Sequence, residues 1–299
     1  MMRVAAIQTT ATADRADNLR TAAAFVSEAA DAGAELVVLP EYFSVAGSAR
    51  SIRERAESLD GPTVSWAAEQ SSRHRIWLVA GTFPERPDTG SADTRMRSTS
   101  CVLGPDGAVA AVYRKVHLFD VQVEGATFHE SATFAPGQAL STVGLSPQPV
   151  RDGPSTRAGE GGGAVADPVL GLSVCYDLRF PELYRILALE GATVVTVPAA
   201  FTAATGPAHW EVLLRARAIE NEVFVVAAGQ IGELPGGMPS CHGHSMIVSP
   251  WGTVVAEAGD GGTGMVIADL DFNEQARVRR QLPVLANRQP AAYRWPHGS

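Results

Sequence analysis

The sequence contains little of what marks secreted, membrane-bound or disulfide-rich proteins. Among its 299 residues there are only three cysteines, Cys101, Cys175 and Cys241, too few and too widely spaced for a disulfide framework or a zinc ribbon. No run of about 20 apolar residues is present, so no membrane-spanning helix is expected. The N-terminal MMRVAAIQTTATADRADN also lacks the long apolar core of a secretory signal. We therefore expect a cytoplasmic protein with free thiols and no membrane partner.

Positive charge is scarce as well. Lys and Arg number 24 against 32 Asp and Glu, a net charge of −8, which argues against nucleic-acid binding because that needs clustered positive charge. P-loop, H-E-x-x-H and C-x-x-C motifs are absent. Cys241, His242 and His244 lie too close together for a tetrahedral metal site. We expect no nucleic-acid partner, no cofactor and no metal.

Hydrophobic residues make up 45% of the chain, enough to bury a sizeable core, and they fall into short apolar runs that alternate with amphipathic stretches. Strands are expected at 3–8, 35–40, 76–81, 98–104, 108–115, 169–175, 193–198, 224–228, 245–249, 253–258 and 264–270, and helices at 17–32, 62–73, 181–190, 207–221 and 271–281. This order predicts an α/β protein with one mixed sheet or two sheets and with helices outside.

No interdomain linker stands out, so we expect a single domain over residues 1–299. The exception to regular patterning is the Gly/Pro-rich stretch at about 146–168, which lies between two expected strands. A loop of this length is usually functional or disordered. We interpret it as a mobile insertion at the tip of a hairpin.

Three polar residues stand at the ends of otherwise apolar strands: Glu41, Lys115 and Cys175. Taken singly, the cysteine would be a small buried hydrophobe and the two charged residues would be solvated. Taken together, a carboxylate can accept the thiol proton, an ammonium group can stabilise an oxyanion, and a thiolate is a good nucleophile. A turn from Cys175 into a helix would further favour the thiolate.

The segments VVLPEYF (37–43), YRKVHLFD (113–120) and SVCYDLRFPELYR (173–185) carry these residues in a recognisable order. They resemble the nitrilase superfamily of carbon–nitrogen hydrolases, and the resemblance extends over nearly the whole chain. It implies a four-layer αββα sandwich, a Glu–Lys–Cys catalytic set, and a homodimer or higher homo-oligomer.

By this resemblance Glu41 is the general base, and Lys115 stabilises the tetrahedral intermediate. Cys175 attacks the carbonyl and forms a thioester, and the backbone N–H of Tyr176 shares the oxyanion hole with Lys115. Glu130 occupies the place of the family's second glutamate and would orient Lys115 and the incoming water or amine. The alternative interpretation is that Glu130 is a solvated residue in a loop.

The resemblance also indicates the substrate class. Arg179 would clamp a substrate carboxylate, unless it forms a structural salt bridge with Glu182, and Phe201, Thr202 and Thr205 would shape the acyl pocket. The run TGPAHWEVLLRARAIE (205–220) is similar to the branch of amidases that act on deaminated glutathione and on ω-amides of 2-oxo acids.

We therefore expect an amidase for a small carboxylated amide of the deaminated-glutathione type. An ω-amidase acting on 2-oxoglutaramate or 2-oxosuccinamate is the nearest alternative. An N-carbamoyl amino acid hydrolase, a nitrilase or a catalytically silent binding subunit are further ones. A serine nucleophile in Gly243-His244-Ser245 is rejected, because no helix and no second glycine follow it.

Overall fold

A computed structural model describes residues 1–123, 126–146 and 167–293 of the chain. Its first sheet is mixed, in the order β17-β1-β2-β3-β5-β4, with β6 paired to β5. The strands are β17 (Gly264–Leu270), β1 (Met2–Gln8), β2 (Leu36–Val38), β3 (Trp77–Val79), β5 (Arg97–Leu103), β4 (Phe83–Glu85) and β6 (Val109–Arg114). Strands β1, β2 and β3 run parallel, which leaves the segments after them at one edge of the sheet.

The second sheet has the order β16-β15-β12-β11-β10-β9. Its strands are β16 (Val254–Glu257), β15 (Met246–Val248), β12 (Phe224–Gly229), β11 (Val194–Ala199), β10 (Val169–Leu172) and β9 (Thr142–Gly144). Its central strands β10, β11 and β12 are again parallel. Strands β9 and β10 are antiparallel, so the expected insertion connects them as a hairpin would. Its predicted mobility concerns residues 147–166, which lie outside the described part of the chain.

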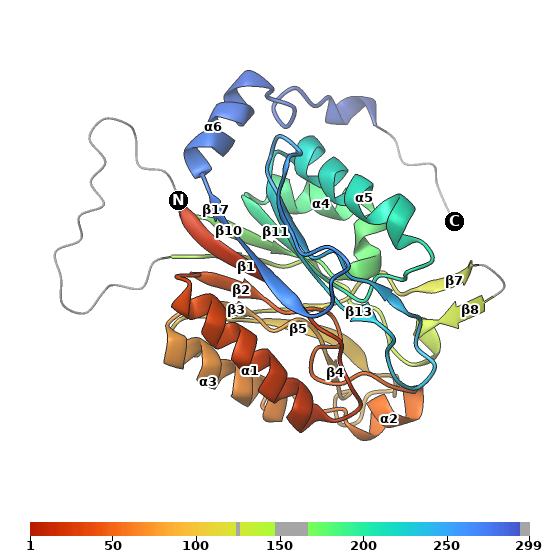
Figure 1. Ribbon diagram of the computed structural model, residues 1–299. Helices are drawn as coiled ribbons and strands as arrows, with labels where there is room; N and C mark the ends of the chain where they lie inside the picture. Colours follow the sequence, from red (N-terminus) through yellow and green to blue (C-terminus); the bar gives the residue numbers. More distant parts are fainter. Residues whose placement is uncertain (124–125, 147–166, 294–299) are drawn as a thin grey trace.

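Helices cover the outer face of each sheet (Figure 1). Helices α1 (Arg15–Asp31) and α3 (Pro62–His74) lie against the first sheet, and α4 (Pro181–Leu189) and α5 (Gly206–Asn221) lie against the second. The four-layer αββα sandwich expected from the sequence is therefore confirmed. The remaining α-helices are α2 (Ala49–Glu54) and α6 (Phe272–Gln281). None of the helices in the described ranges is long and apolar enough to cross a bilayer.

The alternation of side chains along β1 shows how the layers are held together. Val4 and Ala6 belong to the apolar cluster between the sheets, whereas Ala5 and Ile7 pack with Val26 under α1. Successive side chains of a strand point to opposite faces, so a strand buried on both sides is continuously apolar. This pattern accounts for the uninterrupted hydrophobic runs in the sequence.

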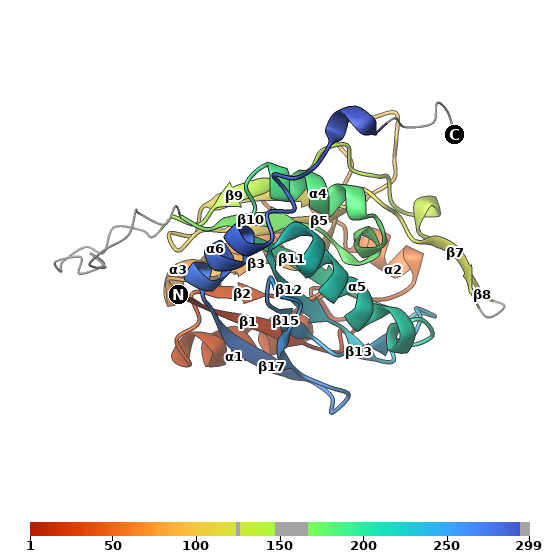
Figure 2. The same ribbon diagram turned by 90° about the horizontal axis from the view of Figure 1, so that it is seen from above.

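Helix boundaries follow local signals. Asp14 caps α1 by accepting hydrogen bonds from the N–H groups of Ala16 and Asp17, and α3, α4 and α5 each have proline in the first turn. The expected helices are found within two residues of their predicted ends. The short elements that were not predicted include α2, strand β4, and the ribbon of β7 (Asp120–Val123) and β8 (Ala126–His129), which projects from the body (Figure 2).

Candidate active site

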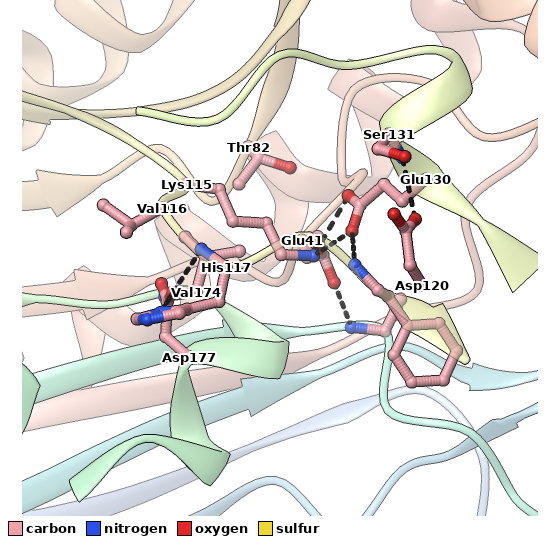
Figure 3. Close-up of polar contacts among 12 residues, drawn as sticks. Glu41, Thr82, Lys115, Val116, His117, Asp120, Glu130, Ser131, Val174 and Asp177 are labelled. Atoms are coloured by element: carbon pink, nitrogen blue, oxygen red, sulfur yellow. Dashed lines mark hydrogen bonds and ion pairs between the residues drawn. The ribbon is translucent and has the colours of Figure 1, made fainter. Parts of the chain in front are cut away.

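Three side chains converge where the two sheets meet, each from a segment that follows a strand. Glu41 lies three residues beyond β2, Lys115 directly follows β6, and Cys175 begins the short 3-10 helix η2 (Cys175–Arg179) after β10. Their exposed fractions are only 1%, 2% and 7%. Figure 3 shows Lys115 between Glu41 and Glu130. The structure thus brings together the residues that the sequence singled out.

The backbone at this site is held in unusual conformations. Tyr42 and Cys175 have positive φ angles of 58° and 47°, a region that costs side-chain-bearing residues energy. The N–H of Tyr42 is held by the hydroxyl of Thr82 at 3.0 Å. Gly81 permits the close approach of its own backbone to that of Pro40, because a Cβ on residue 81 would lie 1.9 Å from the carbonyl oxygen of Pro40. The surrounding packing therefore fixes the segment that carries Glu41.

The ammonium group of Lys115 is bound by two buried carboxylates. Its Nζ lies 2.9 Å from Oε1 of Glu41 and 3.0 and 2.9 Å from the two oxygens of Glu130. Burial alone would lower the pKa of Lys115, but the negative charges of Glu130 and Glu41 outweigh it and raise the pKa well above its ordinary value. The two carboxylates therefore favour the charged form of Lys115 at the centre of the site.

Glu130 is positioned by groups on both of its oxygens. It begins the 3-10 helix η1 (Glu130–Ala132) directly after β8. Its Oε2 accepts a hydrogen bond of 2.6 Å from the N–H of Phe119, and its Oε1 accepts one of 3.4 Å from the Tyr42 hydroxyl. Burial raises the pKa of Glu130, and the positive charge of Lys115 opposes the shift. With a side chain only 9% exposed, Glu130 is a partner of Lys115 and not a solvated loop residue.

The environment of the Cys175 thiol favours its protonated form. Burial raises the pKa of Cys175 well above its ordinary value, the Glu41 carboxylate raises it further, and Lys115 lowers it. The sequence had suggested that a following helix would favour the thiolate. That expectation is wrong, because η2 spans only five residues and α4 begins at Pro181. Burial and the negative charge of the neighbouring Glu41 carboxylate both disfavour the thiolate.

Two donors remain for an oxyanion beside Cys175. The N–H of Tyr176 lies in the first turn of η2, and among the described residues no acceptor is bonded to it. The Lys115 ammonium is the second, since it has three protons and can bind each carboxylate with one of them. Donors of this kind stabilise negative charge that develops on a carbonyl oxygen.

The guanidinium of Arg179 contacts a hydroxyl group, a histidine ring and an aromatic ring. It bonds Oγ1 of Thr205 at 3.2 Å and Nδ1 of His209 at 3.1 Å, and it lies 5.1 Å from the centre of the Phe201 ring. The alternative salt bridge to Glu182 is not found, and no carboxylate among the described residues pairs with Arg179. Within the described ranges, its positive charge is thus not neutralised by an ion pair.

These residues line one cavity of about 270 Å³. Its wall contains both polar groups and aromatic and aliphatic side chains. The sequence-predicted residues on its wall are Glu41, Lys115, Glu130, Cys175, Tyr176, Arg179, Phe201, Thr202 and Thr205. Cys241 lies there too, where burial raises its pKa to about 12 and its thiol bonds the carbonyl oxygen of Pro239 at 3.6 Å.

Sequence reasoning missed a second group of cavity residues. Tyr42 adjoins Glu41 in the VVLPEYF motif. Its place on the cavity wall depends on a positive φ angle, which no sequence pattern indicated. Phe119, Phe128 and His129 reach the cavity from the β7–β8 ribbon and its approach, and Met238 from a glycine-containing loop. Aromatic residues flanking Glu130 were the available signal, because a short ribbon has no periodicity of its own.

The histidines near Cys241 form a structural pair. His242 stacks on His244 with ring centres 4.3 Å apart, and Nδ1 of His244 lies 2.6 Å from Glu257. The backbone carbonyl of His244 accepts a bond from the indole of Trp210 in α5 at 2.7 Å. Within the described ranges no cluster of His, Cys, Asp and Glu has the geometry to hold a metal ion.

The four-layer sandwich and the buried cluster of Glu41, Lys115 and Cys175 point to a nitrilase-type hydrolase. Comparison with known proteins agrees, because the carbon–nitrogen hydrolase family model matches residues 3–280. The chain belongs to this family and is a hydrolase acting on carbon–nitrogen bonds.

Similar proteins include human deaminated glutathione amidase, 41% identical over 97% of this chain and 83% of its own length. Human omega-amidase NIT2 is 37% identical over 97% of this chain and 96% of its own. Both belong to the branch that the sequence had indicated.

Solved structures show the same fold. Saccharomyces cerevisiae Nit3, a member of branch 10 of the nitrilase superfamily, superimposes with a TM-score of 0.80 at 30% identity, covering 97% of this chain and 96% of its own. An amidase from Nesterenkonia sp. AN1 has a TM-score of 0.74 at 27% identity, covering 97% and 94%. In that structure the acetamide moiety of fluoroacetamide is covalently bound to the active-site cysteine.

Proposed function

We propose that this protein is an amidase that hydrolyses a small carboxylated amide of the deaminated-glutathione type through a thioester on Cys175. The observation that carries the proposal is the buried cluster in which Lys115 lies 2.9 Å from both Glu41 and Glu130, on the wall of the cavity that Cys175 and Arg179 also line. The relatives named for deaminated glutathione support the substrate class.

Acylation uses the protonated thiol and its neighbouring carboxylate. Glu41 takes the proton of Cys175 while Sγ adds to the amide carbonyl carbon. The carbonyl oxygen becomes an oxyanion between the Lys115 ammonium and the N–H of Tyr176. The carbon–nitrogen bond then breaks, Glu41 returns the proton to the leaving nitrogen, and ammonia or an amine departs from the thioester.

Deacylation repeats these chemical steps with water as the nucleophile. Glu41 removes a proton from the water as its oxygen adds to the thioester carbonyl, and the same two donors bind the second oxyanion. The carbon–sulfur bond breaks and the Cys175 sulfur regains its proton. Glu130 keeps Lys115 charged and aimed at this point through both of its oxygens, and with Glu41 it orients the entering water or leaving amine.

Charge supports a carboxylated substrate bound at a distance from the reacting atoms. Two carboxylates surround the single ammonium of Lys115, so the cluster itself would repel an anion. Arg179 supplies a cation that no described carboxylate neutralises, and its planar fork matches a carboxylate. Phe201, Thr202 and Thr205 line the same cavity and would shape the space for the acyl chain.

An ω-amidase acting on 2-oxoglutaramate or 2-oxosuccinamate is the second candidate, and the 37% identity to human omega-amidase NIT2 favours it. Both candidates share the mechanism and differ only in the amide. The protein's three thiols, all free in the structure, fit the proposed cytoplasmic location. A homodimer is proposed from the family resemblance alone.

The test is a comparison of turnover on deaminated glutathione, 2-oxoglutaramate, an N-carbamoyl amino acid and a simple nitrile. We expect the highest kcat/KM for deaminated glutathione and an acyl adduct on Cys175 by intact-mass spectrometry. Cys175→Ala should abolish turnover, whereas the matched Cys241→Ala variant should retain it. A wild-type protein that turns over none of the four and forms no adduct would identify a catalytically silent binding subunit.

A further inference from the structure

The segments that carry Lys115 and Cys175 are joined by one buried carboxylate, that of Asp177. This side chain is 0% exposed, and both of its oxygens accept hydrogen bonds. Its Oδ2 lies 2.7 Å from the hydroxyl of Tyr113 and 2.8 Å from the N–H of Val174. Its Oδ1 lies 2.7 Å from Nδ1 of His117 and 3.1 Å from the N–H of the same residue.

Three of the four donor groups belong to Tyr113 and His117, the residues that flank Lys115 at a distance of two positions. Tyr113 is the penultimate residue of β6, and Lys115 and His117 lie in the segment that directly follows the strand. In the view of Figure 3, His117 and Asp177 lie on one side of Lys115 and Glu130 lies on the other. A shift of Tyr113 or His117 would therefore move the backbone from which the Lys115 side chain extends.

The remaining contacts hold the cysteine turn. The N–H of Val174 bonds Asp177 and the N–H of Asp177 bonds the carbonyl oxygen of Val174, which closes the turn around Cys175 with its φ of 47°. The His117 ring also stacks on Phe180 at the end of η2, with ring centres 3.6 Å apart. One carboxylate thus fixes both the nucleophile's turn and the segment of its cationic partner.

We propose that Asp177 is a positioning residue that sets the placement of the Lys115 ammonium relative to the Cys175 sulfur. The proposal rests on the proposed function of these two residues. It holds that Asp177 contacts no substrate and acts through Tyr113 and His117. Displacement of a reacting group by about 1 Å can lower the rate roughly a hundredfold. The loss of one hydrogen bond to Asp177 should therefore change the rate measurably.

The experiment removes one hydrogen-bond donor to Asp177 at a time and leaves Asp177 in place, because Asp177→Asn could simply fail to fold. Tyr113→Phe deletes the hydroxyl donor, and His117→Phe deletes the Nδ1 donor while keeping an aromatic ring to stack on Phe180. The matched control is Tyr184→Phe. Tyr184 is an equally buried tyrosine whose hydroxyl bonds Ser173 at 2.8 Å.

Three measurements are made on each variant: kcat and KM for the preferred amide, the pH profile of Cys175 alkylation by iodoacetamide, and the midpoint of thermal unfolding. For Tyr113→Phe and His117→Phe we expect kcat to fall by about tenfold with KM within about twofold of wild type. Their alkylation profiles should move to higher pH, because a displaced Lys115 stabilises the thiolate less. Tyr184→Phe should change neither.

The proposal is overturned if the two variants lose no more kcat than the Tyr184→Phe control, or if their alkylation profiles coincide with that of wild type. A loss of activity that merely follows the unfolding temperature equally in all three variants also overturns it. Failure of the proposed function is a separate result, because alkylation of Cys175 reports on the Lys115–Cys175 arrangement even if no amide of the panel is hydrolysed.

Discussion

Oε2 of Glu41 accepts a hydrogen bond of 2.8 Å from the backbone N–H of Ala200, and this bond crosses from one sheet to the other. Glu41 follows β2 of the first sheet, and Ala200 follows β11 of the second. Its Oε1 binds Lys115, and its backbone carbonyl accepts a bond from Gln230 at 2.9 Å. The orientation of the proposed general base therefore depends on how the two sheets pack.

This arrangement makes Glu41→Gln an informative variant. Glutamine keeps an acceptor oxygen for Ala200 but cannot take a proton, so turnover should fall by roughly 10²- to 10⁴-fold. The fold should persist, because Lys115 keeps its ion pair with Glu130. Steady-state kinetics check the loss of turnover, and thermal unfolding followed by circular dichroism checks that the fold persists. An unfolded variant would mean that Glu41 is first of all a structural partner.

Lys115→Met should behave differently, since it leaves Glu41 and Glu130 buried without their cation. Removing one partner of a buried ion pair costs about 3–5 kcal/mol, so the free energy of unfolding should drop by that order along with turnover. The control is the double variant Lys115→Met/Glu130→Gln, which has one buried charge fewer. It should recover part of the stability and none of the activity. Equal stability of the two variants in urea titrations would contradict the assigned charges.

The sequence predicted the sandwich well because its signals are local and repeated. The apolar runs of β1 and β12 and the proline at the start of α3 each depend on a few neighbouring residues. The strand expected at 35–40 is shorter, only Leu36–Val38, because the chain leaves the sheet before Pro40 and turns at Tyr42. Strand ends are set by pairing partners that a periodicity cannot reveal.

The candidate site could be predicted only in part. Glu41, Lys115 and Cys175 stand at strand ends, where side chains of α/β proteins gather, and the family resemblance supplied Glu130. The role of Asp177 could not be predicted, since its four donors come from segments about 60 residues apart that meet only when the sheets pack.

Alkaline pH should destabilise the protein through its buried thiols. Burial raises the pKa of Cys101 from 9.0 to about 12, and the same cause raises that of Cys241 to about 12. Above about pH 9 these thiols ionise in the unfolded chain but stay protonated in the folded one, so the unfolded state binds fewer protons. The free energy of unfolding should then fall by about 1.4 kcal/mol per pH unit for each thiol.

Urea titrations between about pH 8 and 11 measure this slope. Cys101→Ala should unfold more easily at every pH, because it leaves a cavity, but its stability should fall less steeply with pH than that of wild type. Other buried groups titrate in both proteins, so the difference between the two slopes isolates the thiol. Parallel curves would show that Cys101 ionises alike in the folded and unfolded chains.

Arg179 should govern discrimination between carboxylated and neutral amides. Its guanidinium is held by Thr205 and His209 and lies 5.9 Å from the ring centre of Tyr176, on the cavity wall and without a described carboxylate partner. Arg179→Gln removes the charge and the fork. We expect KM for a carboxylated amide to rise by roughly 10- to 100-fold, since hydrogen bonds to charged groups contribute about 1.5–3 kcal/mol.

A neutral amide of similar size is the internal control, and its KM should change little in Arg179→Gln. Thr205→Val serves as the matched variant, because it loses one hydrogen bond to the guanidinium and keeps the charge. Its KM for the carboxylated amide should therefore lie between those of wild type and Arg179→Gln. If Arg179→Gln raises KM equally for both amides, Arg179 shapes the cavity wall without binding the carboxylate, and the discrimination must come from elsewhere in the cavity.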